Sequence, residues 1–171
     1  MAGFLHFIMS DGKTHATATT ALIFPVAMAS LLLHPSDPFS AMAAGAIGCA
    51  TGLIIDPDLD IDDITRSEWQ MIKKLWIVGM LWVTLWYPYA WLIPHRSPLS
   101  HWPLLGTAGR VLYLLLWVKL LGVILGGSVG ILAIISHPLF MIWFYGLAVA
   151  DTAHFIMDVV SSKMKRIRKL I

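Results

Sequence analysis

The stretch that decides the fold is Phe39–Ile55, FSAMAAGAIGCATGLII, with the acidic stretch Asp56–Asp63, DPDLDIDD, directly after it. Five carboxylates within eight residues repel one another at the end of an apolar run unless a cation neutralises them. A divalent metal ion is the usual solution, because hard cations favour oxygen ligands. The alternative is a solvated acidic loop, the commonest fate of a charge run. The position against an apolar helix favours the metal.

The composition is typical of a membrane protein. The chain is 58% hydrophobic and 13% charged, whereas a soluble domain carries about 25% charged residues. Its eight Trp residues, several of them within Trp69–Trp102, suit side chains placed at a bilayer interface. The single cysteine, Cys49, lies in an apolar run, which excludes a disulfide framework and a Cys-based zinc site.

Two pairs of apolar segments predict two transmembrane hairpins, over residues 16–55 and 104–160 of one integral membrane domain that comprises the whole chain. In the first hairpin, Ala16–Leu33 is uncharged and just long enough to span a bilayer core. The small residues of the next run permit close backbone approach, which places that helix inside the bundle. In the second hairpin, His137-Pro138 separates the helices, with Gly126-Gly127 as an alternative turn.

Between the hairpins, residues 56–102 hold the acidic loop and the uncharged segment Leu75–Ile93. This segment is long enough to span a bilayer, but its Trp and Tyr residues also suit a helix lying in the interface plane. Hydropathy leaves both open. A basic tail, residues 161–171, ends the chain.

Two segments resemble the beginning or end of a known binding loop but lack residues that the loop requires. Asp56-x-Asp58-x-Asp60 begins like a calcium loop, but Ile61 and Ser67 stand where that loop needs glycine and glutamate. Gly12-Lys13-Thr14 ends like a phosphate-binding loop, but its first glycine position is Phe7 and no strand precedes it. His15, which follows, is on its own a polar residue at a helix start.

Two other segments carry candidate ligands. His95 and His101 flank a proline, and Arg96 beside them has the fork geometry that clamps a phosphate or carboxylate. Contact with lipid headgroups is an equal alternative for these three residues. Asp151, His154 and Asp158 fall at i, i+3 and i+7 on one helical stripe, which indicates a shared metal or, alternatively, a satisfied buried polar network.

Together these motifs resemble those of prokaryotic membrane proteins described as metal-binding and of unknown function. The resemblance covers nearly the whole chain and rests on Gly12-Lys13-Thr14-His15, Pro57-Asp58-Leu59-Asp60, His95-Arg96-Ser97-x-x-Ser100-His101, Gly106-Thr107-x-x-Arg110 and Asp151-x-x-His154-x-x-x-Asp158 with Ser162-Lys163. That family is similar to the membrane-bound metal-dependent hydrolases of the YdjM type. More distantly, it is similar to zinc-dependent phospholipase C and single-strand nucleases.

In that distant group, a helical His-x-x-x-Asp pair and an early His build a multinuclear zinc site for phosphodiester cleavage. The resemblance implies the same role for His154, Asp158 and His15, although this chain lacks the additional His-x-x-x-Asp/Glu pair of the soluble enzymes. The resemblance also implies that the candidate ligands form one cluster. His15 and Asp56 share a membrane side if residues 16–55 form a hairpin, and His95 and His101 join them only if Leu75–Ile93 does not cross.

We therefore expect an all-α bundle of four transmembrane helices plus an aromatic interfacial or re-entrant segment. The metal is zinc, with manganese as the alternative, because mixed histidine–carboxylate ligation suits both better than calcium. There are more candidate ligands than one tetrahedral site can use. Either two metal ions bind, or some of the carboxylates only position the ligands. The candidate ligands are His15, Asp56, Asp58, Asp60, His95, His101, Asp151, His154 and Asp158.

The expected function is hydrolysis of a phosphoester at the membrane face, with Asp58 or Asp60 as general base and Arg96 on the substrate phosphate. A metal-stabilised structural or regulatory protein is the non-enzymatic alternative. The expected partners are membrane lipids, a phosphorylated lipid as substrate and a second copy of the chain, and no nucleic acid. The basic tail predicts a cytoplasmic-membrane protein whose site and both termini face the cytoplasm.

Overall fold

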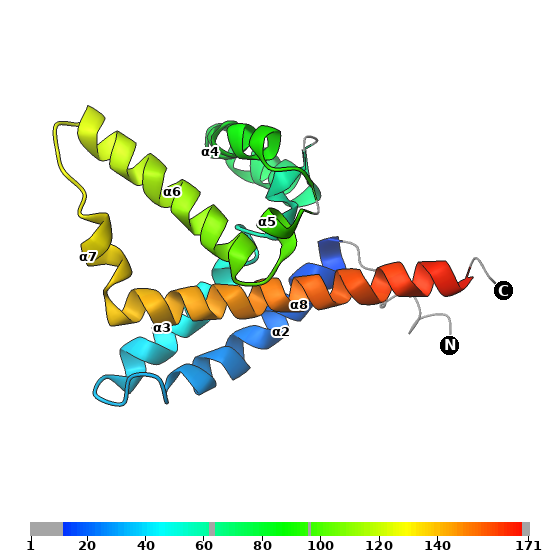
Figure 1. Cartoon of the computed structure of the whole chain (residues 1–171), viewed down its shortest axis with the longest axis horizontal. Coiled ribbons are helices and arrows are strands. Elements are labelled where there is room, and N and C mark those ends of the chain that lie inside the picture. Colours follow the sequence, from blue (N-terminus) through cyan, green and yellow to red (C-terminus); the bar gives the residue numbers. More distant parts are fainter. Residues whose placement is uncertain (1–11, 62–63, 96, 169–171) are drawn as a thin grey trace.

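Figure 1 shows the computed structural model of the chain, which describes residues 12–61, 64–95 and 97–168. Within these ranges the chain forms helices and connecting turns and no strand. The all-α prediction is therefore confirmed. The elements are α2 (Gly12–Ser30), α3 (Pro38–Thr51), the 3-10 helix η1 (Pro57–Asp60), α4 (Arg66–Leu92), α5 (Pro98–His101), α6 (Leu105–Ile124), α7 (Ile131–Ile135) and α8 (Pro138–Arg168).

α3 packs against both α2 and α8, which also contact each other, so it lies inside the bundle as its small residues predicted (Figure 1). It begins at Pro38, and Asp37 caps it by accepting a hydrogen bond from the Ser40 backbone N–H at 3.2 Å. A Cβ added to Gly48 would lie 2.0 Å from the Trp143 carbonyl oxygen on α8. Backbone contact between α3 and α8 therefore requires a glycine here.

α4 reverses direction instead of running straight. Its backbone is not helical at Leu75 and Trp76. A Cβ on Gly79 would lie 2.5 Å from the Ile72 Cα, whereas seven residues of straight helix span about 10 Å. The two halves of α4 therefore lie against each other, and both ends of the segment return to η1. The reversal lies at the start of residues 75–93, and the re-entrant form of that segment stays a prediction.

Among the described residues, three helices are long and apolar enough to cross a membrane: Glu68–Leu92, Leu105–Ile124 and Pro138–Ile167. This set differs from the predicted four spans. α3 has 14 residues and is about 21 Å long, short of a hydrocarbon core of about 30 Å. Glu68–Leu92 qualifies by length and composition, but it contains the reversal at Leu75 and Trp76. α2 and α3 pack against each other, as the first predicted hairpin requires. In the second, α6 ends just before the alternative turn Gly126-Gly127, and α7 lies between it and α8. The membrane crossing of both hairpins stays a prediction.

The hairpins and the doubled-back α4 bring distant parts of the chain to one place. The beginning of α2, the turn η1, the short α5 and the second half of α8 meet there, while α6 diverges from α8 away from it (Figure 1). Apolar side chains remain exposed along the diverging helix, among them Leu116, Leu121 and Ile124.

Candidate metal centre

The acidic stretch folds into a tight turn that separates its carboxylates. Pro57 begins η1, and Asp56 caps it by accepting a hydrogen bond from the Asp58 backbone N–H at 3.0 Å. Leu59 is buried with Ile55 against Trp86, which anchors the turn in an apolar cluster. Asp58 and Asp60, one on each side of Leu59, are thereby held against α5 and α8.

Asp58, His101, His154 and Asp158 form what we call the metal group. The Asp58 Oδ1 atom lies 3.6 Å from His154 Nε2 and 3.8 Å from His101 Nε2. The Asp158 Oδ2 atom lies 3.6 Å and 3.9 Å from the same two nitrogens. Two carboxylates from different elements thus flank one pair of imidazole nitrogens.

These spacings fit a metal ion better than a hydrogen-bonded network. A tetrahedral zinc site with ordinary bond lengths has ligand–ligand separations of about 3.4 Å, whereas a hydrogen bond needs about 2.9 Å. His101 and His154 are 7% and 4% exposed, and neither Nε2 atom has a hydrogen-bond partner among the described residues. Buried polar atoms normally have partners, so a cation bound between the four side chains would satisfy both nitrogens.

Asp60 lies on the Nδ1 side of His101, away from the Nε2 atom that faces the metal group. It is 1% exposed, and its Oδ1 atom lies 2.7 Å from His95 Nδ1. Its Oδ2 atom lies 3.4 Å from His101 Nδ1, which is also 3.0 Å from the Ser100 hydroxyl. A carboxylate on the Nδ1 side of a histidine fixes the tautomer that leaves Nε2 free to bind metal. Asp60 is therefore placed to orient His101, and with His95 and His101 it also forms a set close enough to hold an ion.

His15 meets the metal group through the other carboxylate oxygen of Asp158. Its Nε2 atom lies 3.3 Å from Asp158 Oδ1, and its ring stacks on His154 with centroids 3.8 Å apart. His15, His154 and Asp158 form one of three sets of side chains close enough to hold an ion, beside Asp58–His101–His154 and Asp60–His95–His101. Asp158 could thus bind one cation or bridge two.

The charges of the site are mutually stabilised. Burial opposes ionisation of Asp58, but the neighbouring imidazoles of His101 and His154 outweigh it and hold its pKa well below the usual range. Burial likewise opposes a charged His101, but the neighbouring carboxylates of Asp58 and Asp60 outweigh it and raise its pKa to about 9. Burial and the Asp58 charge raise the pKa of Asp56 to about 7. Protons and a metal ion would therefore compete for the same side chains.

Asp151, a predicted ligand, lies in a different contact. Its Oδ2 atom accepts hydrogen bonds from Arg110 Nη2 and Thr107 Oγ1, both at 2.5 Å. Asp151 and Arg110 are 2% and 0% exposed, so they form a buried ion pair. Sequence reasoning gave Arg110 no role, although an arginine beside an apolar segment is a signal that it could have used.

The remaining predicted residues are placed as follows. Asp56 caps η1 and, like Asp151, is in none of the three metal-capable sets found among the described residues. His95 contacts Asp60 and lies edge-on to the His101 ring, with centroids 5.3 Å apart, and its side chain is 38% exposed. Arg96, the predicted phosphate ligand, lies outside the described residues.

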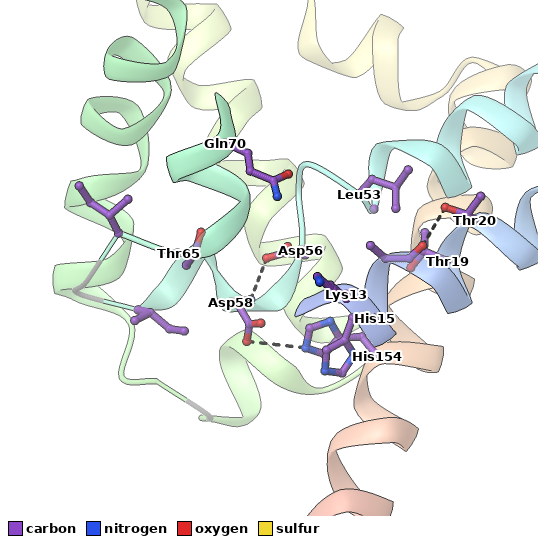
Figure 2. Close-up of a pocket in the computed structure, with 14 residues that line it drawn as sticks. Lys13, His15, Thr19, Thr20, Leu53, Asp56, Asp58, Thr65, Gln70 and His154 are labelled. Carbon is purple, nitrogen blue, oxygen red and sulfur yellow. Dashed lines mark hydrogen bonds and ion pairs between the residues drawn. The ribbon is translucent and has the colours of Figure 1, made fainter. Parts of the chain in front are cut away.

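Two cavities adjoin the metal group. One, of about 590 Å³, has His15, Asp58 and His154 gathered at one wall, together with Asp56 and Lys13 (Figure 2). The other, of about 340 Å³, is lined by His101, Asp158 and one face of α8. The metal group is therefore reached from two sides, and all four of its residues line one cavity or the other.

Comparison with known proteins agrees with this geometry. The profile of a family described as uncharacterized metal-binding proteins (DUF2227) matches residues 10–168. No curated protein and no solved structure matches the chain. The matched region contains every candidate ligand, and the prediction of a metal-binding protein is confirmed.

Proposed function

The chain belongs to this metal-binding family, and we propose that its metal group is the centre of a hydrolase acting on a phosphoester at the face of a membrane. The observation that carries the proposal is that water and substrate can reach the metal group through cavities. Structural zinc sites are closed by their ligands, whereas catalytic sites keep room for water and substrate. Here Asp58 and His154 line a cavity of about 590 Å³, and His101 and Asp158 line one of about 340 Å³.

Each residue has a role that its contacts support. Asp58, His101, His154 and Asp158 would hold a divalent ion, and His15 would join through the second oxygen of Asp158. The ion, when bound, would lower the pKa of water to supply the nucleophile and polarise the phosphoryl oxygen. Asp60 and His95 would keep His101 in the ligating tautomer. Asp60 is thereby a poor general base, because both its oxygens face histidines.

The donor set suits zinc, with manganese as the alternative. Two imidazoles and two carboxylates are a mixed nitrogen–oxygen set of the kind both ions accept. The exposed apolar side chains along α6 and the long, apolar α8 support a position in a lipid bilayer. Lys163, Lys165 and Arg166 near the end of α8 support a cytoplasmic orientation of the site. Lipids would then surround the bundle, and a phosphorylated lipid would be a local substrate.

The test combines metal content with turnover. Protein purified in detergent should contain stoichiometric zinc or manganese by elemental analysis and should hydrolyse a chromogenic phosphodiester, with loss of activity in chelator. Asp58→Asn should lose both metal and activity. His34→Gln, at a partly exposed histidine in the α2–α3 turn, is the matched control and should keep both. Bound metal without turnover on any phosphoester offered would count against the hydrolase.

A metal-stabilised structural or regulatory protein is the second candidate, and the ligand count favours it. Four protein donors can complete a tetrahedral zinc site, which leaves no position for substrate. The two candidates differ in the spectrum of cobalt-substituted protein. Added phosphate should change the visible absorption of an open site that gains a fifth ligand, and should leave that of a closed site unchanged.

A further inference from the structure

The two cavities beside the metal group differ in their lining charges. The larger has the carboxylates of Asp56 and Asp58, together with the ammonium group of Lys13 and the imidazoles of His15 and His154. The smaller has Lys163 and Arg166 against the single carboxylate of Asp158. Before any metal binds, the smaller cavity is therefore basic on balance, whereas the larger one has groups of both signs.

The smaller cavity is also the one that offers an apolar wall. Its α8 residues follow an i, i+3, i+4 spacing and so share one helix face: Phe155, Asp158, Val159, Ser162, Lys163 and Arg166. The apolar pair lies toward the metal group and the basic pair lies further along the helix. An anion with an apolar substituent would match both halves of this wall.

A second observation points to a ligand at the same place. His101 lines this cavity, is 7% exposed, and has an Nε2 atom with no hydrogen-bond partner among the described residues. Asp158, the other metal-group member here, faces the same nitrogen at 3.9 Å. A group bound in the smaller cavity would therefore lie directly beside the metal group.

We propose that the smaller cavity is the anion subsite of the protein, in which Lys163 and Arg166 hold the phosphoryl group of a phosphate ester that carries an apolar substituent. This proposal rests on the proposed function and names its substrate class. The guanidinium of Arg166 can make two parallel hydrogen bonds to phosphoryl oxygens, and Lys163 adds a point charge.

The basic residues have a simpler explanation, namely that they only mark the cytoplasmic side of α8. The chain supplies a matched control for it, because Lys165 is exposed on the same helix between the two and does not line the cavity. A general effect of positive charge at the membrane face would involve Lys165 equally. A subsite would involve Lys163 and Arg166 only.

The experiment measures phosphate binding to zinc-loaded protein in detergent by titration calorimetry, without turnover. The double variant Lys163→Gln/Arg166→Gln should weaken binding of inorganic phosphate roughly tenfold or more. Lys165→Gln and Lys13→Gln, the latter in the larger cavity, should leave the affinity within about twofold. Nanodiscs of phosphatidylcholine with and without phosphatidic acid then distinguish a lipid phosphate from a free phosphate ester.

Each outcome tests the anion subsite independently of the proposed hydrolase activity. Loss of phosphate affinity in the double variant alone supports the subsite, even if no phosphoester is turned over. If phosphatidic acid binds more tightly than inorganic phosphate and depends on the same two residues, the anion is a lipid headgroup. Equal weakening by Lys165→Gln, weakening by Lys13→Gln, or no phosphate binding by the zinc-loaded parent would overturn the subsite.

Discussion

Arg110 Nη2 donates to Asp151 Oδ2 at 2.5 Å, and the other terminal nitrogen of Arg110 donates to the Ser100 carbonyl at 2.7 Å. Ser100 precedes His101, and Asp151 lies one helical turn before His154. One fully buried guanidinium on α6 therefore ties together the two elements that present the imidazoles of the metal group. The spacing of those imidazoles depends on a contact outside the metal group.

Arg110→Met is accordingly expected to destabilise the protein and loosen the metal group. Removing one partner of a buried ion pair leaves an uncompensated charge and typically costs about 3–5 kcal/mol. Arg110→Met/Asp151→Leu, which removes both charges, should recover part of the loss. Thermal unfolding in detergent with chelator would measure stability, and zinc titration would measure affinity. A double variant less stable than Arg110→Met would contradict this account of the pair.

Gly48→Ala is expected to separate α3 from α8. The new Cβ would lie 2.0 Å from the Trp143 carbonyl oxygen, and a backbone atom cannot move aside as a flexible side chain can. Overpacking of this kind costs about 1–3 kcal/mol or more. Gly130→Ala is the control, since its Cβ would have only ordinary contact, 3.7 Å from Ala133. Equal unfolding temperatures for the two variants would show that α3 and α8 are not in backbone contact.

Much of the fold could be predicted because the small residues of Phe39–Ile55 and the break at His137-Pro138 are local signals. The course of Leu75–Ile93 could not be read from hydropathy, because a span and a re-entrant segment have the same composition. Only the requirement that His95 and His101 join His15 and Asp56 favoured the re-entrant form. In the structure the chain doubles back at Leu75 and Trp76, where that segment begins, and its position in a membrane stays a prediction.

The roles of the individual carboxylates could not be predicted. Asp56, Asp58 and Asp60 look equivalent in sequence, but the single turn of η1 directs them to a helix cap, the metal group and His101 respectively. Asp151 shares a helical stripe with His154 and Asp158, yet it forms an ion pair with Arg110 from another helix. Assigning these roles requires contacts between elements, which spacing along one element does not contain.

Asp60→Asn is expected to weaken metal binding without removing a ligand. The amide can no longer accept charge-assisted hydrogen bonds from both His95 and His101, so the His101 tautomer is less strongly fixed. Loss of such a positioning carboxylate typically lowers metal affinity about 10- to 100-fold. Competition with a zinc chelator of known affinity would measure the change. An affinity equal to that of the parent would show that Asp60 does not act through His101.

As the pH rises, the metal-free protein should lose stability, whereas the stabilisation by zinc should increase. With a folded pKa of about 9, a charged His101 stabilises the metal-free fold fully below its unfolded pKa of about 6.5, and this stability is lost as the pH rises through about 9. Zinc competes with that proton, so its affinity should rise over the same range. Unfolding temperatures between these pH values, with chelator and with zinc, would test both signs. His101→Asn should flatten the metal-free response.

His154→Ala separates a metal ligand from a buried polar residue. If His154 only satisfies a polar network, its loss leaves an unpaired group that costs about 1–3 kcal/mol, equally with and without chelator. If it binds metal, an ion at a hundred times its dissociation constant stabilises the parent by about 2.7 kcal/mol and the variant by much less. We expect the second result, because the His154 Nε2 atom lies 3.6 Å from both Asp58 and Asp158 with no hydrogen-bond partner among the described residues. Unfolding temperatures measured with zinc, manganese and chelator would decide, with His34→Ala as the histidine control. A variant that gains as much stability from metal as the parent would remove His154 from the ligand set.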